Sequence, residues 1–180
     1  MSADAEDGTQ PPSSRRVFFA LWPDPAVRTQ LVRATREPVR LSGGRPTAKD
    51  RLHVTIAFLG SLTEAGLTVA RGVPPIGVGA FDFVLDRLGA FANGGVLWID
   101  ARSVPPALTE LERLLWAGLE AQGFIREERV YRPHVTLARR ARPVEAEVPP
   151  VEWRVTELAL VESLPDGSKV HYEVLETWPL

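Results

Sequence analysis

The sequence predicts an α+β protein with one core assembled from two related halves. The chain has 180 residues and a hydrophobic fraction of 44%, which suits one domain or two small lobes that share a core. Short apolar runs typical of strands alternate with stretches of helical periodicity. The pentamer HVTIA, which begins at residue 53, returns almost unchanged as HVTLA at residue 134. The repeat is the strongest sign that the halves are related.

The first half of the chain is expected to alternate strands and helices. Asp24 is a suitable N-cap, because Pro25 suits the first position of a helix and apolar residues follow at helical spacing. Gly60 is expected to end the strand that carries the first pentamer. In chain order, the expected elements are a strand over 15–23, a helix over 24–40, a loop over 41–50, a strand over 51–60 and a short helix over 62–73.

The second half is organised around the clearest helix of the chain. Leu108, Leu111, Leu115 and Leu119 repeat at helical spacing, and Gly123 follows as a stop. The expected elements are strands in 81–91 and over 95–101 around a turn at 93–95, a helix over 105–123, and strands over 131–139, 151–163 and 170–180, with a turn at 165–167. The order of elements in both halves indicates a duplicated α+β unit.

Composition narrows the classes of protein to consider. The chain has no Cys, which excludes disulfides, thiolate catalysis and cysteine-based zinc sites. No apolar run approaches the length of a membrane span, and the acidic, polar start does not resemble a signal peptide. We therefore expect a cytoplasmic protein with no membrane partner, and a monomer. Residues 1–14 are expected to form a disordered tail, and residues 15–180 a single domain.

Charge is distributed unevenly along the chain. Residues 15–51 hold nine basic and three acidic side chains, and residues 126–142 hold six basic and two acidic ones. Together these segments carry +10, although the whole chain carries −2. Both pentamers lie at or inside the basic segments, a pattern that suits an anionic ligand. Solvated arginines with no ligand would produce the same pattern, so charge alone leaves the choice open.

The two pentamers present the same polar pair. Side chains alternate faces along a strand, so His53 and Thr55 point the same way, and so do His134 and Thr136. The intervening apolar residues would then face a core. One neutral imidazole can take a proton from a nucleophile while one imidazolium gives a proton to the leaving oxygen, since the ordinary pKa of histidine is about 6.5. Threonine hydroxyls can donate hydrogen bonds to phosphate oxygens. This set of side chains suits phosphoryl transfer.

Histidines on strands also serve purposes other than proton transfer. A single His-x-Thr on a strand is most often structural. Two histidines could also bind zinc, but no carboxylate stands at metal-ligand spacing, so no metal and no cofactor are expected. The repetition favours duplication or shared chemistry, because chance would rarely place nearly the same four residues after two of the three histidines. His171 has no matching threonine and is expected to be an exposed strand residue.

The segments HVTIAFLG and YRPHVTLAR resemble the two signature motifs of the two-histidine phosphoesterase superfamily. More narrowly, they are similar to those of the RNA 2′,3′-cyclic phosphodiesterases, which are also called 2′-5′ RNA ligases (LigT-like). The opening RVFFALWPD and the ending YEVLETWPL match the usual ends of that family, so the resemblance spans residues 15–180. It implies two pseudo-symmetric lobes of mainly antiparallel sheet, outer helices, and an active cleft between the lobes. The compact stretch 60–81 departs from the family pattern and puts substrate length in question.

The resemblance also implies site residues. His53 and His134 take the catalytic positions, and Thr55, Thr136, Arg139 and Tyr131 take substrate-binding positions. Arg139 presents a conflict, because it follows His134 by five residues and strict alternation would place it on the opposite face. It can reach the cleft only if the strand bulges, twists or ends nearby.

The expected reaction is metal-independent hydrolysis of a terminal 2′,3′-cyclic phosphate, on RNA or a nucleotide, to a 2′-phosphate. His134 is assigned as the base and His53 as the acid, although the near-symmetry of the motifs gives little ground for this order. One alternative is the reverse step, in which a 5′-hydroxyl end attacks and forms a 2′-5′ bond. Another is a nucleotide- or RNA-binding module with an inactive cleft, against which the intact His and Thr pairs argue.

Overall fold

The computed structural model describes residues 14–73, 77–91, 95–167 and 169–180. Apart from Ser14, the expected tail at 1–14 lies outside the described residues. So does the expected turn at 93–95, apart from Gly95.

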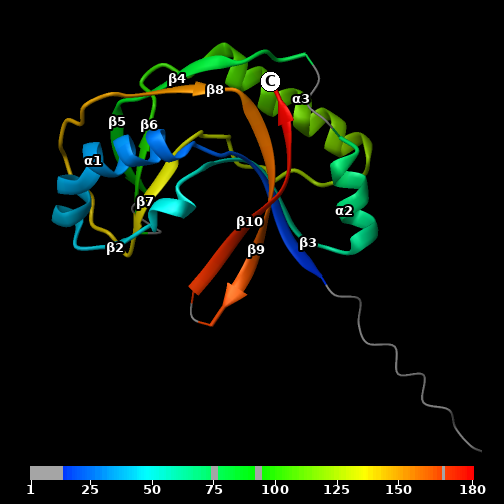
Figure 1. The fold of residues 1–180 in the computed structure, drawn as a ribbon, viewed down its shortest axis with the longest axis horizontal. Helices are drawn as coiled ribbons and strands as arrows, with labels where there is room; N and C mark the ends of the chain where they lie inside the picture. Colours follow the sequence, from blue (N-terminus) through cyan, green and yellow to red (C-terminus); the bar gives the residue numbers. More distant parts are fainter. Residues whose placement is uncertain (1–13, 74–76, 92–94, 168) are drawn as a thin grey trace, which may run out of the picture.

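The described chain forms strands and helices in the following order (Figure 1). They are β1 (Arg15–Leu21), α1 (Pro25–Ser42), β2 (Arg45–Pro46), a short 3-10 helix (Lys49–Arg51), β3 (Val54–Leu62), α2 (Glu64–Arg71), β4 (Phe81–Leu85), β5 (Arg87–Phe91), β6 (Val96–Asp100), α3 (Pro106–Ala121), β7 (Val135–Arg139), β8 (Val151–Val155), β9 (Glu157–Asp166) and β10 (Lys169–Pro179).

One large sheet runs through both halves of the protein. Its strand order is β10-β9-β1-β3-β7-β6-β5, and β2 pairs with β7. A small second sheet contains β4 and β8. All of these pairings are antiparallel. The expected α+β class with mainly antiparallel sheet is confirmed.

The strand registers show that the two halves repeat the same unit. In β1 and β3 the pairs are Leu21↔Val54, Ala20↔Thr55 and Phe19↔Ala57. In β6 and β7 they are Ile99↔Val135, Trp98↔Thr136 and Leu97↔Ala138. Each series skips one residue at the same position of the second strand, Ile56 in one half and Leu137 in the other. The halves therefore share both a register and a β-bulge, which confirms the duplication indicated by the pentamers.

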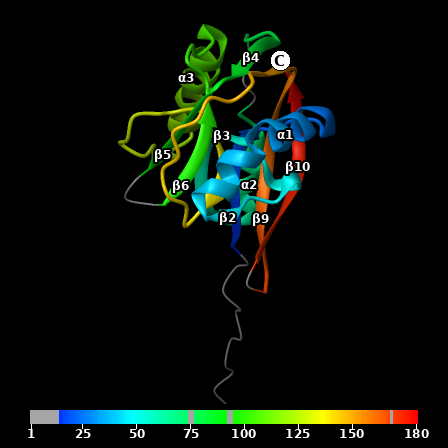
Figure 2. The ribbon, with the colours of Figure 1, turned by 90° about the vertical axis from the view of Figure 1, so that its left-hand side faces the viewer.

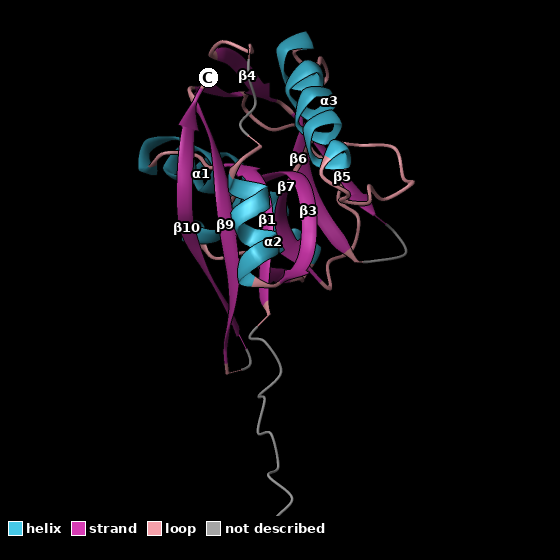
Figure 3. Ribbon diagram, turned by 90° about the vertical axis from the view of Figure 1, so that its right-hand side faces the viewer, coloured by secondary structure: helices cyan, strands magenta, loops and turns pink. Residues whose placement is uncertain are grey.

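The helices cover the sheet in a crossed arrangement. Helix α1, which connects β1 to β3, contacts β7 and β8 of the other half, whereas α3, which connects β6 to β7, contacts β3. Figures 2 and 3 view the protein from opposite sides; α1 is nearest the viewer in one, and α2 and α3 are nearest in the other. Each half therefore buries the sheet of its counterpart, so the lobes share one core.

The expected helices form for the reasons that their sequences predict. The Asp24 carboxylate accepts hydrogen bonds from the backbone N–H groups of Ala26 and Val27, at 2.7 and 2.8 Å, and so caps α1. The leucine stripe of α3 is fully buried. Helix α1 extends to Ser42, beyond the expected end at residue 40, because its stop is Gly43 in the left-handed conformation (φ 64°). The expected loop over 41–50 consequently contains the helix end, β2 and part of the 3-10 helix.

Several strand boundaries differ from the expected ones. Gly60 does not end β3; it lies at φ 74° beside a second register shift, and the strand continues to Leu62. The stretches 81–91 and 151–163 each contain two strands, because the chain leaves the small sheet at Asp86 and at Thr156 and enters the large one. Strand β7 begins at Val135 and not at residue 131. Hydrophobic periodicity does not reveal such changes of sheet.

Candidate active site

The two histidines immediately precede β3 and β7 and are held in the same way. Nδ1 of His53 lies 2.7 Å from the carbonyl oxygen of Arg51, and Nδ1 of His134 lies 2.7 Å from that of Arg132. A carbonyl oxygen can only accept, so each Nδ1 carries the proton that it donates. In a neutral ring this leaves Nε2 as the proton-accepting atom. Both imidazoles are thus fixed in one tautomer by the residue two positions earlier.

Strand register places both polar pairs on one face. Val54 pairs with Val135 across β3 and β7, and both side chains are fully buried. Extending this antiparallel register by one residue sets His53 opposite Thr136 and Thr55 opposite His134. Directly opposed side chains lie on the same face of a sheet. The structure therefore brings His53, Thr55, His134 and Thr136 together, each only partly buried.

The β-bulge resolves the conflict over Arg139. Leu137 and Ala138 are consecutive, and both are buried, at 3% and 0% exposed. Two inward side chains in succession shift the alternation by one residue, so Arg139 is exposed on the same face as His134 and Thr136. Arg139 also lies near enough to His53 for its charge to contribute to a lowered pKa of that ring. The structure places Arg139 on the face of the sheet that carries both histidines.

His53 is enclosed by aromatic rings. The Trp22 ring stacks on it at 5.2 Å between centroids and 21° between planes, and Phe18 and Tyr172 lie at 5.0 and 5.3 Å. Burial is the main cause that lowers the pKa of His53 to about 4. The positive charges of His134, Arg139 and Arg28 act in the same direction, and the hydrogen bond to Arg51 opposes them. The ring is therefore neutral in the free protein near neutral pH.

His134 has a different electrostatic environment. Phe91 and Trp98 meet its ring at 5.1 and 6.3 Å. Burial again lowers the pKa of His134. The hydrogen bond to the Arg132 carbonyl and the charge of Asp100 act in the opposite direction, and the charges of Arg132 and Arg129 lower the pKa further. Asp100 is 2% exposed and accepts hydrogen bonds from Arg87, at 2.7 and 2.8 Å, and from Arg132 at 3.0 Å. The guanidinium of Arg132 lies 4.0 Å from the Trp98 ring centroid. The two histidines are thus alike in tautomer but not in charge environment.

Tyr131 links the two halves. Its hydroxyl donates a hydrogen bond to the backbone carbonyl of Thr55 at 3.2 Å. Burial, together with the charge of Glu112, raises the pKa of the phenol well above its ordinary value, so it stays protonated. This hydrogen bond holds the strand that carries Thr55, and Tyr131 also lines a pocket beside that strand. Its expected contact with substrate stays a prediction.

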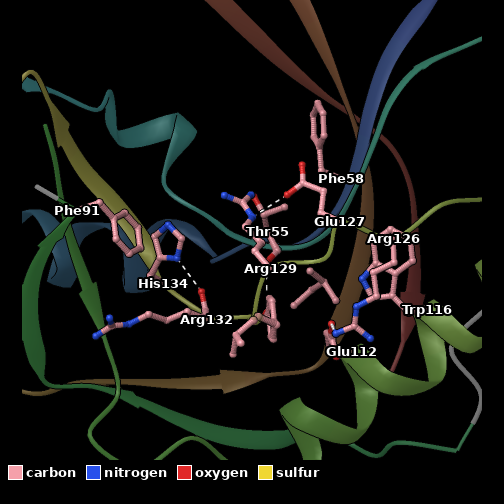
Figure 4. A pocket seen from close by; sticks show the side chains of 13 residues that line it. Thr55, Phe58, Phe91, Glu112, Trp116, Arg126, Glu127, Arg129, Arg132 and His134 are labelled. Carbon is pink, nitrogen blue, oxygen red and sulfur yellow. Dashed lines mark hydrogen bonds and ion pairs between the residues drawn. The ribbon is translucent and has the colours of Figure 1, made fainter. Parts of the chain in front are cut away.

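This pocket, of about 390 Å³, opens beside the motifs. Its lining includes Thr55 and His134, but His53 and Thr136 are not part of it. Figure 4 shows His134 and Arg132 on one side, Glu112 and Arg126 on the other, and Thr55 between them. The pocket therefore begins at the polar face of the sheet and extends to α3 on one side.

Sequence reasoning missed several residues of the site. Trp22 and Tyr172 contact His53, and the guanidinium of Arg28 lies 5.1 Å from the Trp22 ring centroid. The Arg28 Nε is buried without a hydrogen-bond partner among the described residues, and burial lowers the pKa of this guanidinium. Trp22 and Tyr172 lie in the two end segments that resemble the family, but nothing in those segments indicates that their side chains contact His53. His171 is exposed on β10 as expected, and it is the next residue, Tyr172, that packs on the site.

Among the described residues, no group of three or more His, Asp or Glu side chains is placed to hold a metal ion. None of the helices in the described ranges combines the length and apolar character needed to cross a membrane.

The two-lobed antiparallel fold and the paired His-x-Thr strands define a two-histidine phosphoesterase. A family model described as the 2′-5′ RNA ligase superfamily matches residues 22–167. The chain belongs to this superfamily.

Individual relatives agree with this assignment. The RNA 2′,3′-cyclic phosphodiesterase of Escherichia coli is 33% identical over 174 residues, covering 92% of this chain and 97% of that protein. The protein of the same name from Thermus thermophilus is 33% identical over 187 residues, covering 92% and 90%. Among solved structures, Escherichia coli LigT complexed with 3′-AMP superposes with a TM-score of 0.83 and 28% identity, covering 93% of this chain and 99% of that one.

Proposed function

We propose that the protein is an RNA 2′,3′-cyclic phosphodiesterase that opens a terminal cyclic phosphate by paired-histidine acid–base catalysis. The observation that carries this proposal is the shared geometry of His53 and His134, each with Nδ1 committed to a backbone carbonyl and Nε2 left to exchange a proton. The names of the Escherichia coli and Thermus thermophilus relatives support the substrate class. The 3′-AMP complex of LigT supports a nucleotide ligand.

The proposed reaction is an attack of water on the phosphorus atom. One imidazole takes a proton from the water through Nε2, the bond from phosphorus to the ribose 3′ oxygen breaks, and the other imidazole, protonated, gives its proton to that oxygen. The product is a 2′-phosphate beside a free 3′-hydroxyl. Thr55 and Thr136 donate hydrogen bonds to the non-bridging oxygens, and the Arg139 guanidinium stabilises their charge. The side chains of all five residues lie on one face of the sheet, which supports this arrangement.

The order of the two histidines depends on the bound anion. In the free protein, burial among aromatic rings and nearby positive charges keep His53 neutral. Burial, Arg132 and Arg129 also lower the pKa of His134, but there Asp100 acts in the opposite direction, and His53 has no such carboxylate among the causes of its shift. These charges favour His53 as the base, the reverse of the order assigned from the sequence. A phosphate bound beside Arg139 offsets the charge of that guanidinium and so makes His53 easier to protonate. The assignment of His134 as base and His53 as acid stays a prediction.

The remaining parts of the proposal come from the sequence. The substrate is an RNA end or a nucleotide with a 2′,3′-cyclic phosphate, and the protein acts as a cytoplasmic monomer without cofactor. The reverse reaction, formation of a 2′-5′ bond, would use the same side chains. Water is present at about 55 M, so ligation would need both RNA ends to be held in place, and hydrolysis is expected to dominate.

The test is to incubate the protein with 2′,3′-cyclic AMP and with an RNA that ends in a 2′,3′-cyclic phosphate, and to identify the products by mass spectrometry and phosphorus NMR. We expect 2′-AMP from the cyclic nucleotide and a 2′-phosphate end on the RNA. A 3′-phosphate product would contradict the proposed bond cleavage. Tight binding without turnover would favour the binding-module alternative.

A further inference from the structure

The two histidines face different residues at the same position of the repeated unit. The two halves pair their strands alike, through Leu21↔Val54 in one and Ile99↔Val135 in the other. Extending each antiparallel register by one residue sets Trp22 opposite His53 and Asp100 opposite His134. Directly opposed side chains lie on the same face of a sheet. The backbone is therefore repeated, but an indole faces one imidazole and a carboxylate faces the other.

Trp22 gives His53 an apolar neighbour. The indole stacks on the imidazole at 5.2 Å between centroids and 21° between planes, and the Arg28 guanidinium lies 5.1 Å from the indole centroid. Burial of this kind disfavours the charged form of an imidazole. The charges that act on His53 are those of His134, Arg139 and Arg28, and all of them are positive. An indole carries no charge with which to offset them.

Asp100 gives His134 an anionic neighbour and also holds the residue that orients its ring. The carboxylate is 2% exposed and accepts hydrogen bonds from Arg87, at 2.7 and 2.8 Å, and from Arg132 at 3.0 Å. The Arg132 guanidinium also lies 4.0 Å from the Trp98 ring centroid, and the Arg132 carbonyl oxygen lies 2.7 Å from Nδ1 of His134. Asp100 therefore reaches His134 both through its charge and through Arg132.

Stability alone does not account for a buried carboxylate at this position. Replacing a buried ion pair by well-packed apolar residues is often neutral or stabilising, and the other half of the protein has an indole at the same place. The arginines Arg132 and Arg129 disfavour the charged form of His134, whereas Asp100 favours it. The carboxylate therefore offsets positive charge opposite one imidazole, and Trp22 leaves the charge around the other imidazole unopposed.

We propose that Trp22 and Asp100 are positioning residues that make the two repeated histidines unequal: the indole encloses His53, and the carboxylate holds His134 through Arg132 and places a negative charge opposite its ring. The inference rests on the proposed function for the use of this inequality in acid–base catalysis, but the inequality itself belongs to the free protein. In a purely structural role, Asp100 would only fasten its two arginines and Trp22 would only fill space. Neither would then affect where the imidazoles take up a proton.

The test is an NMR titration that follows each imidazole of the whole protein without substrate. Asp100→Asn keeps the shape of the side chain and removes its charge, so the midpoint of His134 should fall by about one pH unit or more. Trp22→Asp gives the first half the residue type of the second, so the midpoint of His53 should rise by about one pH unit or more. Trp22→Phe keeps an apolar ring and should leave the midpoint of His53 below the ordinary histidine pKa.

The matched control is Asp82→Asn. Asp82 forms an exposed ion pair with Arg154 on the small sheet, so removal of its charge should move neither midpoint. The pH dependence of kcat/KM for 2′,3′-cyclic AMP, measured on the same variants, reports the pKa values of the essential groups in the free enzyme. The limb that belongs to His134 should move to lower pH in Asp100→Asn and stay in place in the control.

A folded Asp100→Asn variant with an unchanged His134 midpoint would overturn the inference, and so would a folded Trp22→Asp variant with an unchanged His53 midpoint. Circular dichroism would check the fold of each variant. Trp22 is partly exposed, so its variants keep the test available if Asp100→Asn fails to fold. Because the midpoints are measured apart from turnover, a protein that shows both changes but leaves cyclic phosphates intact would contradict the proposed function and keep the inequality of the histidines.

Discussion

Val54 and Val135 pair directly across β3 and β7, and each is fully buried. In the sequence, each follows a histidine and precedes a threonine. This pairing joins the two halves of the large sheet. It sets each histidine opposite the threonine of the other motif, so the two imidazoles lie diagonally across the joint. The spacing of the two imidazoles is therefore fixed by backbone hydrogen bonds and buried valines rather than by flexible loops.

Removing either imidazole should abolish most turnover. We expect His53→Ala and His134→Ala each to slow hydrolysis of 2′,3′-cyclic AMP by roughly 100- to 10,000-fold, because each removes one proton carrier of a coupled transfer. The double variant should be only slightly slower, since groups that act as a unit do not contribute additively. Thr55→Ala and Thr136→Ala should cost less, as each loses one hydrogen bond. A folded single His variant with near-normal turnover would end the paired mechanism.

Arg139 and Arg142 offer a matched comparison on one segment. Arg139 lies on the polar face of the bulged β7, whereas Arg142 lies beyond the strand. We expect Arg139→Ala to raise KM or lower kcat for 2′,3′-cyclic AMP by about tenfold or more, through loss of a charge-assisted contact with phosphate. Arg142→Ala should change neither constant by more than a factor of about two. Steady-state kinetics decide the comparison, and equal, negligible effects would remove Arg139 from the site.

The sequence was informative where a feature is local or repeated. The leucine stripe predicted α3, Asp24 and Pro25 predicted the start of α1, and the two pentamers predicted the related halves and the shared face of His and Thr. A few neighbouring residues sufficed for each of these inferences, because alternation and helical periodicity act over a few positions.

Contacts between residues far apart in the chain could not be predicted from the sequence. Strict alternation put Arg139 on the wrong face, because the bulge at Leu137 appears only when β6 is paired with β7. Trp22 reaches His53 from the end of β1, and Tyr172 reaches it from β10, more than 100 residues away in the sequence. Glu112 was expected on a helix, but nothing local indicated that its carboxylate would be buried against Arg126. Each of these depends on tertiary packing.

Gly89 should be essential for the environment of His134. It pairs with Trp98 across β5 and β6, and a Cβ at this position would lie 2.0 Å from the indole ring. Gly89→Ala must therefore displace the Trp98 ring. The Arg132 guanidinium lies over this ring, and the ring meets the imidazole of His134. We expect a loss of stability of about 1–3 kcal/mol and reduced turnover. Urea unfolding would measure the first effect. Gly79→Ala is the control, since a Cβ there meets no atom of the described residues within 4 Å.

Turnover should not depend on a divalent metal. The groups proposed to stabilise charge are an imidazolium, the Arg139 guanidinium and two threonine hydroxyls. Dialysis against EDTA should leave kcat and KM for 2′,3′-cyclic AMP unchanged, and added zinc or manganese should not increase the rate. Activity that is lost with the chelator and restored by one metal would contradict this expectation.

The pH dependence of stability should report the burial of His53. Its pKa in the folded protein is about 4, below the ordinary value of about 6.5 expected in the unfolded chain. Between these values the unfolded chain binds a proton that the folded protein does not, so stability falls as the pH is lowered through this window. The lowered pKa of His134 acts with the same sign.

The matching experiment is urea unfolding at pH 7 and at pH 4.5. His53→Gln removes the group that resists protonation, so this variant should lose about 2 kcal/mol less stability than the unmodified protein over that interval. His171→Gln is the control, because that ring is exposed on β10, and it should behave as the unmodified protein does. An NMR titration of the free protein should show the His53 ring protonating at a pH below the ordinary histidine pKa. Added phosphate should raise the midpoint of this titration, because an anion beside Arg139 favours the charged ring. A His53 ring that titrates near pH 6.5 in the free protein would show that the surrounding aromatic rings do not exclude water from it. The bound substrate alone would then determine which histidine is the acid and which is the base.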